Sequence, residues 1–317
     1  MNITVVILTK DEACHIERSL QSVASFADRC VVVDSGSTDQ TIARAKQAGA
    51  EVFVNPWVNH AVQFNWALEQ LSKDTEWVMR LDADEIVTDA LAAEILDKLT
   101  ALGPEVHGVN ISRRLRFLGR SIKWGGGFPS RVLRIFRLGT GRCENRWMDE
   151  HIFVEGKTAE FSGEIIDDNL KPLAWWTEKH NSYSSREVVD MLNHEYRFMD
   201  YETVADLKAG HSAGMKRWLK ENAYVRLPGG IRALLYFFYR YFFRLGILDG
   251  KEGAAFHVLQ GFWYRYLVDM KLHEVKAYMR REDVDVVTAI HLILGVKIEV
   301  SSQQPKNDIN SEIPHDL

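Results

Sequence analysis

The sequence predicts an α/β protein: a mixed sheet with helices on both faces, followed by a C-terminal amphipathic helical region. Over the first hundred residues, short β-branched runs alternate with helical patterns, as in βαβ units around a parallel sheet. From Gly108 to about Phe161, polar and apolar residues alternate between glycines, which suits antiparallel strands and loops. From Ser182 to Met279 the pattern is mainly helical.

The alternating first part resolves into four strands and four helices. We expect strands at Ile3–Leu8, Cys30–Asp34, Glu51–Asn55 and Trp77–Leu81. We expect helices at Glu12–Phe26, Asp39–Ala48, Asn59–Leu71 and Asp89–Leu102. In the first helix, Ile16, Leu20 and Val23 recur at spacings of four and three, so one apolar stripe is expected to face the sheet.

Composition and charge exclude several classes of protein. The chain has 317 residues, of which 46% are hydrophobic and 26% charged, far from the signature of disorder. A net charge of −5 argues against a nucleic-acid partner, and three scattered cysteines suit a reducing compartment better than a disulfide framework. The first apolar run is expected to be a strand and not a signal peptide. No stretch reaches the ~18 apolar residues that a spanning helix needs.

The strongest chemical signal is Asp82-Ala83-Asp84-Glu85, which directly follows the apolar run WVMRL. A strand that ends in this way places two carboxylates at the carboxyl edge of a parallel sheet, where open α/β folds bind ligands. Oxygen ligands suit Mg²⁺ or Mn²⁺, which can bridge to a diphosphate and neutralise charge on a leaving group. The alternative is a helix N-cap, a role that Thr88 could also fill.

Two further strand ends carry polar residues. Asp34 follows the second apolar run and could accept hydrogen bonds from a base or ribose, although a turn with an N-cap explains the loop after it. The first strand ends in Thr9, Lys10, Asp11 and Glu12. Because the carboxyl ends of parallel strands meet at one edge of a sheet, we expect the three segments to line a single crevice.

The segments VVILTKDEACHI, VVVDSGSTDQT and RLDADE, in that order and spacing, resemble the nucleotide-sugar half of family-2 glycosyltransferases with the GT-A fold. The resemblance implies a Rossmann-like mixed sheet and an activity that needs Mg²⁺ or Mn²⁺. The donor-binding residues that it implies are Thr9, Asp11, Glu12, Asp34, Asp82 and Ala83, and the implied metal ligand is Asp84. The sequence departs from the family where Asp11 replaces the more usual Asn and Ser35 replaces a common second Asp.

Later segments resemble a narrower branch, the bacterial enzymes that build lipopolysaccharide core, capsule or other exopolysaccharide. They are QFNWAL at 63–68, WMDEH at 147–151, KHNSY at 179–183 and LGILDG at 245–250. This branch implies donor binding by Asn65 and transfer to a lipid-linked saccharide acceptor, with UDP as the favoured nucleotide of the sugar donor.

The same resemblance divides the chain into four parts. Residues 1–105 are the expected nucleotide-sugar-binding half and residues 106–200 the expected acceptor-binding half. Residues 201–300 are expected to be helical and associated with a membrane. The tail over 301–317 is polar, contains two prolines and is expected to be disordered.

An inverting transfer needs a carboxylate that takes a proton from the acceptor hydroxyl as that hydroxyl attacks the anomeric carbon. Asp149 and Glu150 are the candidates, and we favour Glu150 as the base. His151 is a candidate metal ligand or diphosphate contact, with a structural role as the alternative.

Basic residues are concentrated between Ser112 and Trp147, where ten of them stand against one acid. Arginine is the natural bidentate partner of a phosphate, so this concentration predicts a phosphate-bearing ligand. Arg131 and Arg134 are the candidates for the site, whereas solvated outer faces of strands account for many of the others. The phosphate could belong to the donor or to a lipid-linked acceptor.

The segment IRALLYFFYRYFFRLGIL predicts a helix that is apolar around most of its circumference, with a narrow stripe formed by Arg232, Tyr236, Arg240 and Arg244. Basic residues beside aromatic ones suit a helix lying in the interface of an anionic leaflet, so we expect residues 208–273 to contact a membrane surface. Burial against the following helix is the alternative. The predicted location is cytoplasmic, peripheral on the inner face of the cell membrane.

Three other functions remain as alternatives or are disfavoured. A polyprenyl-phosphate glycosyl synthase would use the same donor half with a lipid phosphate as acceptor. A protein that binds nucleotide sugars without catalysis, as an assembly scaffold, is a second alternative. A dehydrogenase is disfavoured because no G-x-G-x-x-G follows the first strand.

Overall fold

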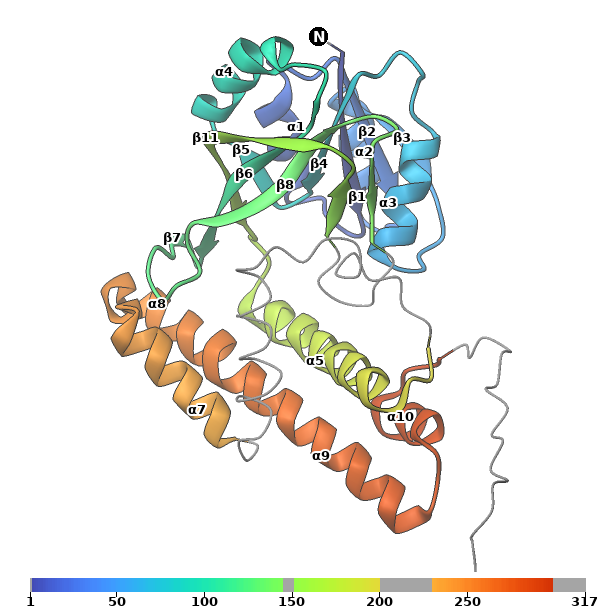
Figure 1. Cartoon of the computed structure of the whole chain (residues 1–317), viewed down its shortest axis with the longest axis vertical. Coiled ribbons are helices and arrows are strands. Elements are labelled where there is room, and N and C mark those ends of the chain that lie inside the picture. Colours follow the sequence, from blue (N-terminus) through green and yellow to red (C-terminus); the bar gives the residue numbers. More distant parts are fainter. Residues whose placement is uncertain (1, 145–150, 200–229, 299–317) are drawn as a thin grey trace, which may run out of the picture.

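The computed structural model describes residues 2–144, 151–199 and 230–298, which form a sheet-containing part and a helical part (Figure 1). The strands are β1 (Ile3–Thr9), β2 (Arg29–Asp34), β3 (Glu51–Val54), β4 (Trp77–Asp82), β5 (Glu85–Val87), β6 (Val106–Phe117), β7 (Arg120–Ser121), β8 (Ser130–Arg137), β9 (Gly141–Cys143), β10 (Ile152–Val154) and β11 (Lys157–Asp168). The α-helices are α1 (Ile16–Val23), α2 (Thr41–Gln47), α3 (His60–Glu69), α4 (Asp89–Lys98), α5 (Leu173–Tyr196), α7 (Ile231–Phe238), α8 (Gly250–Phe256), α9 (Tyr264–Glu282) and α10 (Val286–Leu294).

The four strands and four helices expected in the first hundred residues are confirmed, with small differences at their ends. The largest difference is at α1, which begins at Ile16 and not at Glu12. Residues 13–15 form a turn instead, in which the amide of His15 donates to the carbonyl oxygen of Glu12 at 2.9 Å. The residues between β1 and α1 therefore form a loop.

The large sheet is mixed and has the order β3-β2-β1-β4-β8-β6-β11-β5, with β7 paired to β6. Strands β3, β2, β1 and β4 are parallel, and β8 lies antiparallel between β4 and β6. This confirms the expected mixed α/β fold. Strand β11 runs parallel to β6, whereas the alternating pattern of this region predicted antiparallel strands. Alternation reports which face of a strand is buried and carries no information on the direction of its neighbour.

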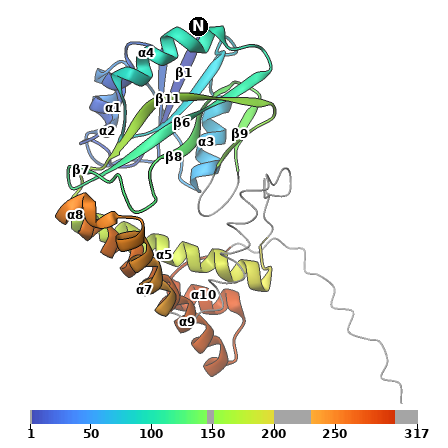
Figure 2. The ribbon, with the colours of Figure 1, turned by 60° about the vertical axis from the view of Figure 1, so that its left-hand side comes forward.

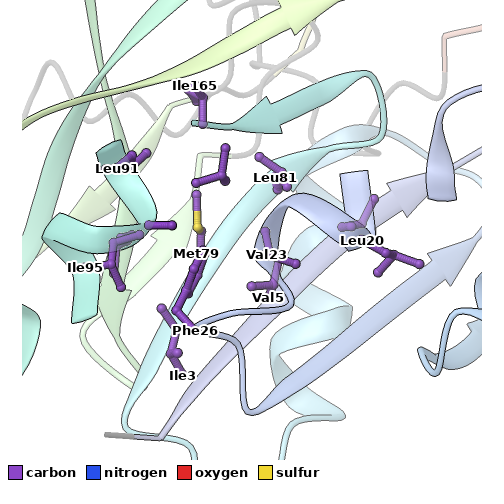
Figure 3. Packing of buried hydrophobic residues seen from close by; sticks show 14 of the residues in the cluster. Ile3, Val5, Leu20, Val23, Phe26, Met79, Leu81, Leu91, Ile95 and Ile165 are labelled. Carbon is purple, nitrogen blue, oxygen red and sulfur yellow. The ribbon is translucent and has the colours of Figure 1, made fainter. Parts of the chain in front are cut away.

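Helices cover both faces of the parallel strands because side chains on successive positions point to opposite faces. Ile3, Val5 and Ile7 of β1 pack in a core that includes residues of α1, α2 and α4, and Figure 3 shows part of it. Val6 packs on the other side in a core that includes Phe64 of α3. The strand ends are thereby held rigidly at the carboxyl edge of the sheet.

The helical part has its own core. Val188, Val189 and Leu192 of α5 pack against residues of α9 and α10. Helix α5 begins at Leu173, nine residues before the mainly helical pattern that the sequence shows from Ser182. Helix α5 falls within the segment 106–200, expected to be the acceptor-binding half, and it shares its core with α9 and α10. Figure 2 shows α5, α7 and α9 gathered beyond one edge of the sheet.

Helix α7 continues into a π-helical turn, Tyr239–Phe243, and a 3-10 turn, Gly246–Asp249. Its basic stripe faces the protein: Arg232 is buried against Asp269 of α9, and buried Arg240 donates from Nε to the carbonyl oxygen of Gly125 at 2.9 Å. Arg232 and Arg240 therefore face the protein, whereas Arg244 is exposed, and membrane contact by residues 208–273 stays a prediction. No helix among residues 2–144, 151–199 and 230–298 is both long enough and apolar enough to cross a membrane.

Candidate active site

The register of the parallel strands brings the predicted strand-end residues together. Thr9 at the end of β1 lies opposite Asp34 at the end of β2, and Leu8 lies opposite Asp82 at the end of β4. The three polar segments thus share one edge of the sheet, the edge where ligands of open α/β folds bind.

Asp34 is fully buried and its carboxylate accepts four hydrogen bonds. Its donors are the hydroxyl of Thr9 (2.8 Å), the amide of Gly36 (2.9 Å), and the amide and hydroxyl of Ser37 (both 2.6 Å). Gly36 has a φ of 85°, a conformation that favours glycine. In this structure Asp34 and Thr9 fix the loop after β2, and a nucleoside contact by either stays a prediction.

The loop after β1 is tied to the loop after β2. Asp11 accepts a hydrogen bond from the amide of Thr38 at 2.7 Å, and this bond lowers the pKa of Asp11 below its usual value. Glu12 pairs with Lys171 at 2.7 Å and with buried His15 at 2.5 Å. Glu12 lines the first of the two cavities described below, and Asp11 lines neither.

Asp82 is held by arginines. Its carboxylate lies 3.0 Å from Arg134 and 3.6 Å from Arg80. Burial raises the pKa of Asp82, but the two guanidinium groups outweigh that effect and hold the pKa well below its usual range. Arg134 also contacts Glu85 at 2.5 Å, and burial raises the pKa of Glu85 to about 7. Asp82 is therefore ionised at neutral pH, and Arg134 is committed to these two carboxylates.

Asp84 is placed differently from Asp82. One of its carboxylate oxygens accepts a hydrogen bond from the amide of Asn169 at 2.8 Å, and the other accepts none from the described residues. The described residues contain no cluster of three His, Cys, Asp or Glu that would form a complete metal site. Mg²⁺ is commonly held by one or two carboxylates together with substrate phosphates and water. The donor set around Asp84 fits a cation shared with a diphosphate.

Two adjoining cavities open at this edge, of about 550 and 560 Å³. Both are lined by His60, Arg80, Asp82, Arg113 and Tyr183, so Asp82 stands where they meet. The first cavity also includes Ala83, Asp84 and Asp167 from the sheet and an aromatic wall from the helical part, among them Trp175, Trp176 and Phe256. Burial raises the pKa of Asp167 to about 6.

The second cavity contains Arg131, Arg134 and His151. Arg131 donates to the carbonyl oxygen of Phe161 at 2.9 Å and lies 3.7 Å from Glu160. Asp149 and Glu150 fall outside the described residues, and His151 is the next residue along the chain.

Asn65 lies in neither cavity. Its side chain joins α3 to β9 through two hydrogen bonds of 2.9 Å, one to the carbonyl oxygen and one from the amide of Cys143. A donor-binding role for Asn65 stays a prediction.

Sequence reasoning did not single out several cavity residues, namely Arg80, Arg113, Asp167, Trp175, Lys179 and Arg186. Arg80 interrupts the apolar run of β4, and a buried charge in a core strand is a signal that could have been used. Lys179 belongs to the segment KHNSY, which was noted without a role. Asp167 carries no local signal because its place depends on the pairing of β11 with β6.

Comparison with known proteins gives a family and several relatives. Residues 4–149 match the family model described as glycosyl transferase family 2. An uncharacterized glycosyltransferase of Rickettsia bellii is 43% identical over 93 residues, which cover 29% of this chain and 31% of that protein. The chain thus matches about a third of the length of that relative.

A second relative is similar over most of its length. The lipopolysaccharide core biosynthesis glycosyltransferase LpsC of Rhizobium meliloti is 25% identical over 292 residues, covering 89% of this chain and 96% of that protein. Among solved structures, glucosyl-3-phosphoglycerate synthase from Mycobacterium tuberculosis, in complex with Mn²⁺, UDP and glucosyl-3-phosphoglycerate, aligns with a TM-score of 0.31 and 26% identity. That alignment covers 36% of this chain and 44% of that chain. The match to glycosyl transferase family 2 thus covers residues 4–149, less than half of the chain.

Proposed function

We propose that the chain transfers a sugar from a nucleotide-diphosphate sugar, with UDP favoured, to a lipid-linked saccharide acceptor in the synthesis of lipopolysaccharide or another bacterial surface polysaccharide. The observation that carries the proposal is the placing of Asp82 and Asp84 at the end of β4, on the wall of a cavity, within the residues that match the family model. The similarity to LpsC over 89% of the chain supports the choice of acceptor class.

For the donor, we propose that Asp82 binds the nucleotide and that Asp84 binds Mg²⁺ or Mn²⁺ together with the diphosphate. A divalent cation there would neutralise the charge that develops on the departing diphosphate. Arg134 keeps Asp82 ionised and oriented. Asn169 donates to one oxygen of Asp84, and the other, which accepts no hydrogen bond from the described residues, is the one proposed to bind the cation.

For the acceptor, we propose that Glu150, with Asp149 as the alternative, removes the proton of the attacking hydroxyl. Both residues lie directly before His151, which lines the second cavity. Asp82, which would bind the donor, borders both this cavity and the first.

We further propose that the helical part rests on the cytoplasmic face of the cell membrane. Its support is an apolar face, defined as Ile231, Leu234, Leu235, Phe238, Tyr239, Phe242 and Phe243, all of them exposed. These residues recur at spacings of three and four, and Arg232 and Arg240 are buried on the opposite side. An apolar stripe of this size on a helix that is docked by its arginines suits shallow insertion at a lipid interface.

A transfer assay tests the proposal. Purified protein is incubated with each nucleotide sugar, Mn²⁺ and lipid-linked saccharides extracted from cells, and formation of the nucleoside diphosphate and labelled lipid is followed. We expect Asp84→Ala to lose transfer at least a hundredfold, whereas Asp97→Ala, an exposed acid of α4, keeps it. Full transfer by Asp84→Ala would exclude the proposed metal site. No turnover of any nucleotide sugar by the folded wild type would exclude the activity.

A further inference from the structure

Helix α5 directs two cations at the candidate active site. Lys179, Tyr183 and Arg186 occupy positions that share one face of a helix, and they line the cavities: Lys179 the first, Tyr183 both and Arg186 the second. The ammonium of Lys179 lies 5.5 Å from the centroid of the Tyr183 ring, and the guanidinium of Arg186 lies 5.9 Å from it. Tyr183 thus separates the two cations and holds both at the cavity wall.

Most other cations of the cavities are already paired with carboxylates. The pairs are Arg80 with Asp82 (3.6 Å), Arg113 with Asp167 (3.0 Å), Arg116 with Asp168 (3.3 Å), Arg131 with Glu160 (3.7 Å), Arg134 with Asp82 (3.0 Å) and Lys171 with Glu12 (2.7 Å). Within the described part of the chain, Lys179 and Arg186 have no carboxylate within 4.0 Å. Arg240 also lacks one there, but its Nε donates to the carbonyl oxygen of Gly125 and so holds a loop.

The charges of Lys179 and Arg186 reach a titratable side chain that the strand-end acid Asp82 also affects. Burial lowers the pKa of Lys179, but the influence of Tyr183 and Asp84 outweighs it and raises the pKa, so Lys179 is charged at neutral pH. Burial lowers the pKa of His60, and the charges of Asp82, Arg80, Lys179 and Arg186 all act on that imidazole. The charged residues of β4 and those of α5 therefore both act on the His60 side chain.

We infer that Lys179 and Arg186 form a phosphate-binding pair that faces the Asp82–Asp84 edge across the cavities. An anion between them would supply the carboxylate-like partner that both cations lack, and charge-assisted bonds to phosphate oxygens are among the strongest in proteins. The phosphate belongs either to the diphosphate of the donor or to a phosphorylated, lipid-linked acceptor. The inference rests on the proposed function for the choice of these two sources.

The test uses the full chain with Lys179→Met and Arg186→Gln combined, and isothermal titration calorimetry in the presence of Mg²⁺. The probes are UDP, GDP, dTDP and CDP, the monophosphate of whichever of these binds, inorganic pyrophosphate, and inorganic phosphate added to protein saturated with the nucleotide. Arg280→Gln is the matched control, because it removes an exposed cation of α9 that lines neither cavity. Lys179→Arg keeps the charge, and circular dichroism confirms that each variant is folded.

If the phosphate is the donor's, the double variant binds the nucleoside diphosphate and pyrophosphate at least tenfold more weakly, while its affinity for the monophosphate changes less than threefold. If it is the acceptor's, nucleotide affinity stays constant and binding of inorganic phosphate to the saturated protein is lost. Either result supports the pair, provided that the control and Lys179→Arg bind as the wild type does. Unchanged affinity for every probe, within twofold, in the folded double variant overturns it.

The outcome also separates the inference from the proposed function. A wild type that binds pyrophosphate but turns over no sugar nucleotide, with pyrophosphate binding lost in the double variant, would support the pair and contradict the transferase. A wild type that transfers sugar, with a double variant that transfers equally well and binds every probe equally, would contradict the pair alone.

Discussion

The guanidinium of Arg134 lies 3.0 Å from the carboxylate of Asp82, so a buried arginine of β8 orients the first acid of the strand-end pair. The same nitrogen lies 2.5 Å from Glu85, whose side chain is 1% exposed. One cation therefore compensates two carboxylates at the turn between β4 and β5. Asp84, the next acid along the edge, has no arginine on its carboxylate among the described residues and accepts one hydrogen bond, from Asn169.

Removing this cation should destabilise the fold. We expect Arg134→Met to lower the free energy of unfolding by about 2–4 kcal/mol, because Asp82 and Glu85 lose their shared partner. Burial already raises the pKa of Glu85 to about 7, so Glu85 can take up a proton in the variant. The loss should therefore be smaller at pH 6 than at pH 8 when measured by urea denaturation.

The matched control for this prediction is Arg131→Met on the same strand, because the Arg131 side chain is 43% exposed. Its pairing with Glu160 is solvated, and we expect a change of less than about 1 kcal/mol. Equal losses in the two variants would mean that Arg134 does not support the acid pair.

His60 should make the protein sensitive to mild acid. Burial lowers the pKa of His60 from 6.5 to about 4, and its Nδ1 has no hydrogen-bond partner among the residues that the structure describes. Below about pH 6.5 the unfolded chain binds a proton that the folded protein does not accept until about pH 4, so the free energy of unfolding falls as the pH falls through this window.

Between pH 7 and pH 5 the wild type should therefore lose about 1–2 kcal/mol more stability than His60→Gln. Glu85 contributes a slope of opposite sign, since its raised pKa favours the folded state at low pH, but it is present in both proteins and cancels in the difference. His273→Gln, at an exposed position of α9, should follow the wild type. Parallel pH profiles for wild type and His60→Gln would contradict the prediction.

The first hundred residues were predictable because their signals are local. The spacing of Ile16, Leu20 and Val23 places them on one face of a helix. The same spacing identifies the helix in the sequence and lets these side chains pack together in the core. The meeting of Thr9, Asp34 and Asp82 at one edge also followed, since parallel strands bring their carboxyl ends together.

The contacts of these side chains were not predictable. Asp34 is satisfied by Thr9, Gly36 and Ser37 within its own loop, and the sequence offers the same residue types to a ligand or to a turn. The burial of Arg232 in α7 was also not predictable, because it depends on Asp269, which lies 37 residues away. Pairing over such a separation leaves no periodic signal.

The apolar face of the helical part should bind lipid. We expect the triple variant Phe238→Ser, Phe242→Ser, Phe243→Ser to bind vesicles of phosphatidylethanolamine and phosphatidylglycerol at least tenfold more weakly than the wild type in a sedimentation assay. The three rings are 43%, 47% and 80% exposed, so their removal takes apolar area from the surface and little from the core.

Because Arg232 and Arg240 are buried, lipid binding should depend more on these rings than on salt. Raising the salt from 0.1 to 0.5 M should therefore weaken vesicle binding by less than the triple variant does. The control is Leu292→Ser on α10, which is 57% exposed but lies outside the apolar face. Vesicle binding by the triple variant equal to that of the wild type would exclude this face as the membrane contact.

A side chain at Gly125, in the loop that contacts Arg240, should destabilise the protein. Gly125 has a φ of +77°, and a Cβ there would lie 2.2 Å from Cε1 of His257, which is fully buried. Gly119 has a similar φ of +81°, but a Cβ there would meet nothing within 4 Å. The two glycines therefore separate backbone strain from steric overlap.

We expect Gly119→Ala to cost about 1–2 kcal/mol, the strain of a left-handed alanine. Gly125→Ala should cost about 1–3 kcal/mol more, because buried His257 must move away from its contact with Asp249. That movement would also shift Gly127 and Phe128, which line the first cavity, so Gly125→Ala should reduce sugar transfer while Gly119→Ala does not. Thermal unfolding and the transfer assay measure both effects, and equal stability of the two variants would show that the loop gives way without disturbing His257.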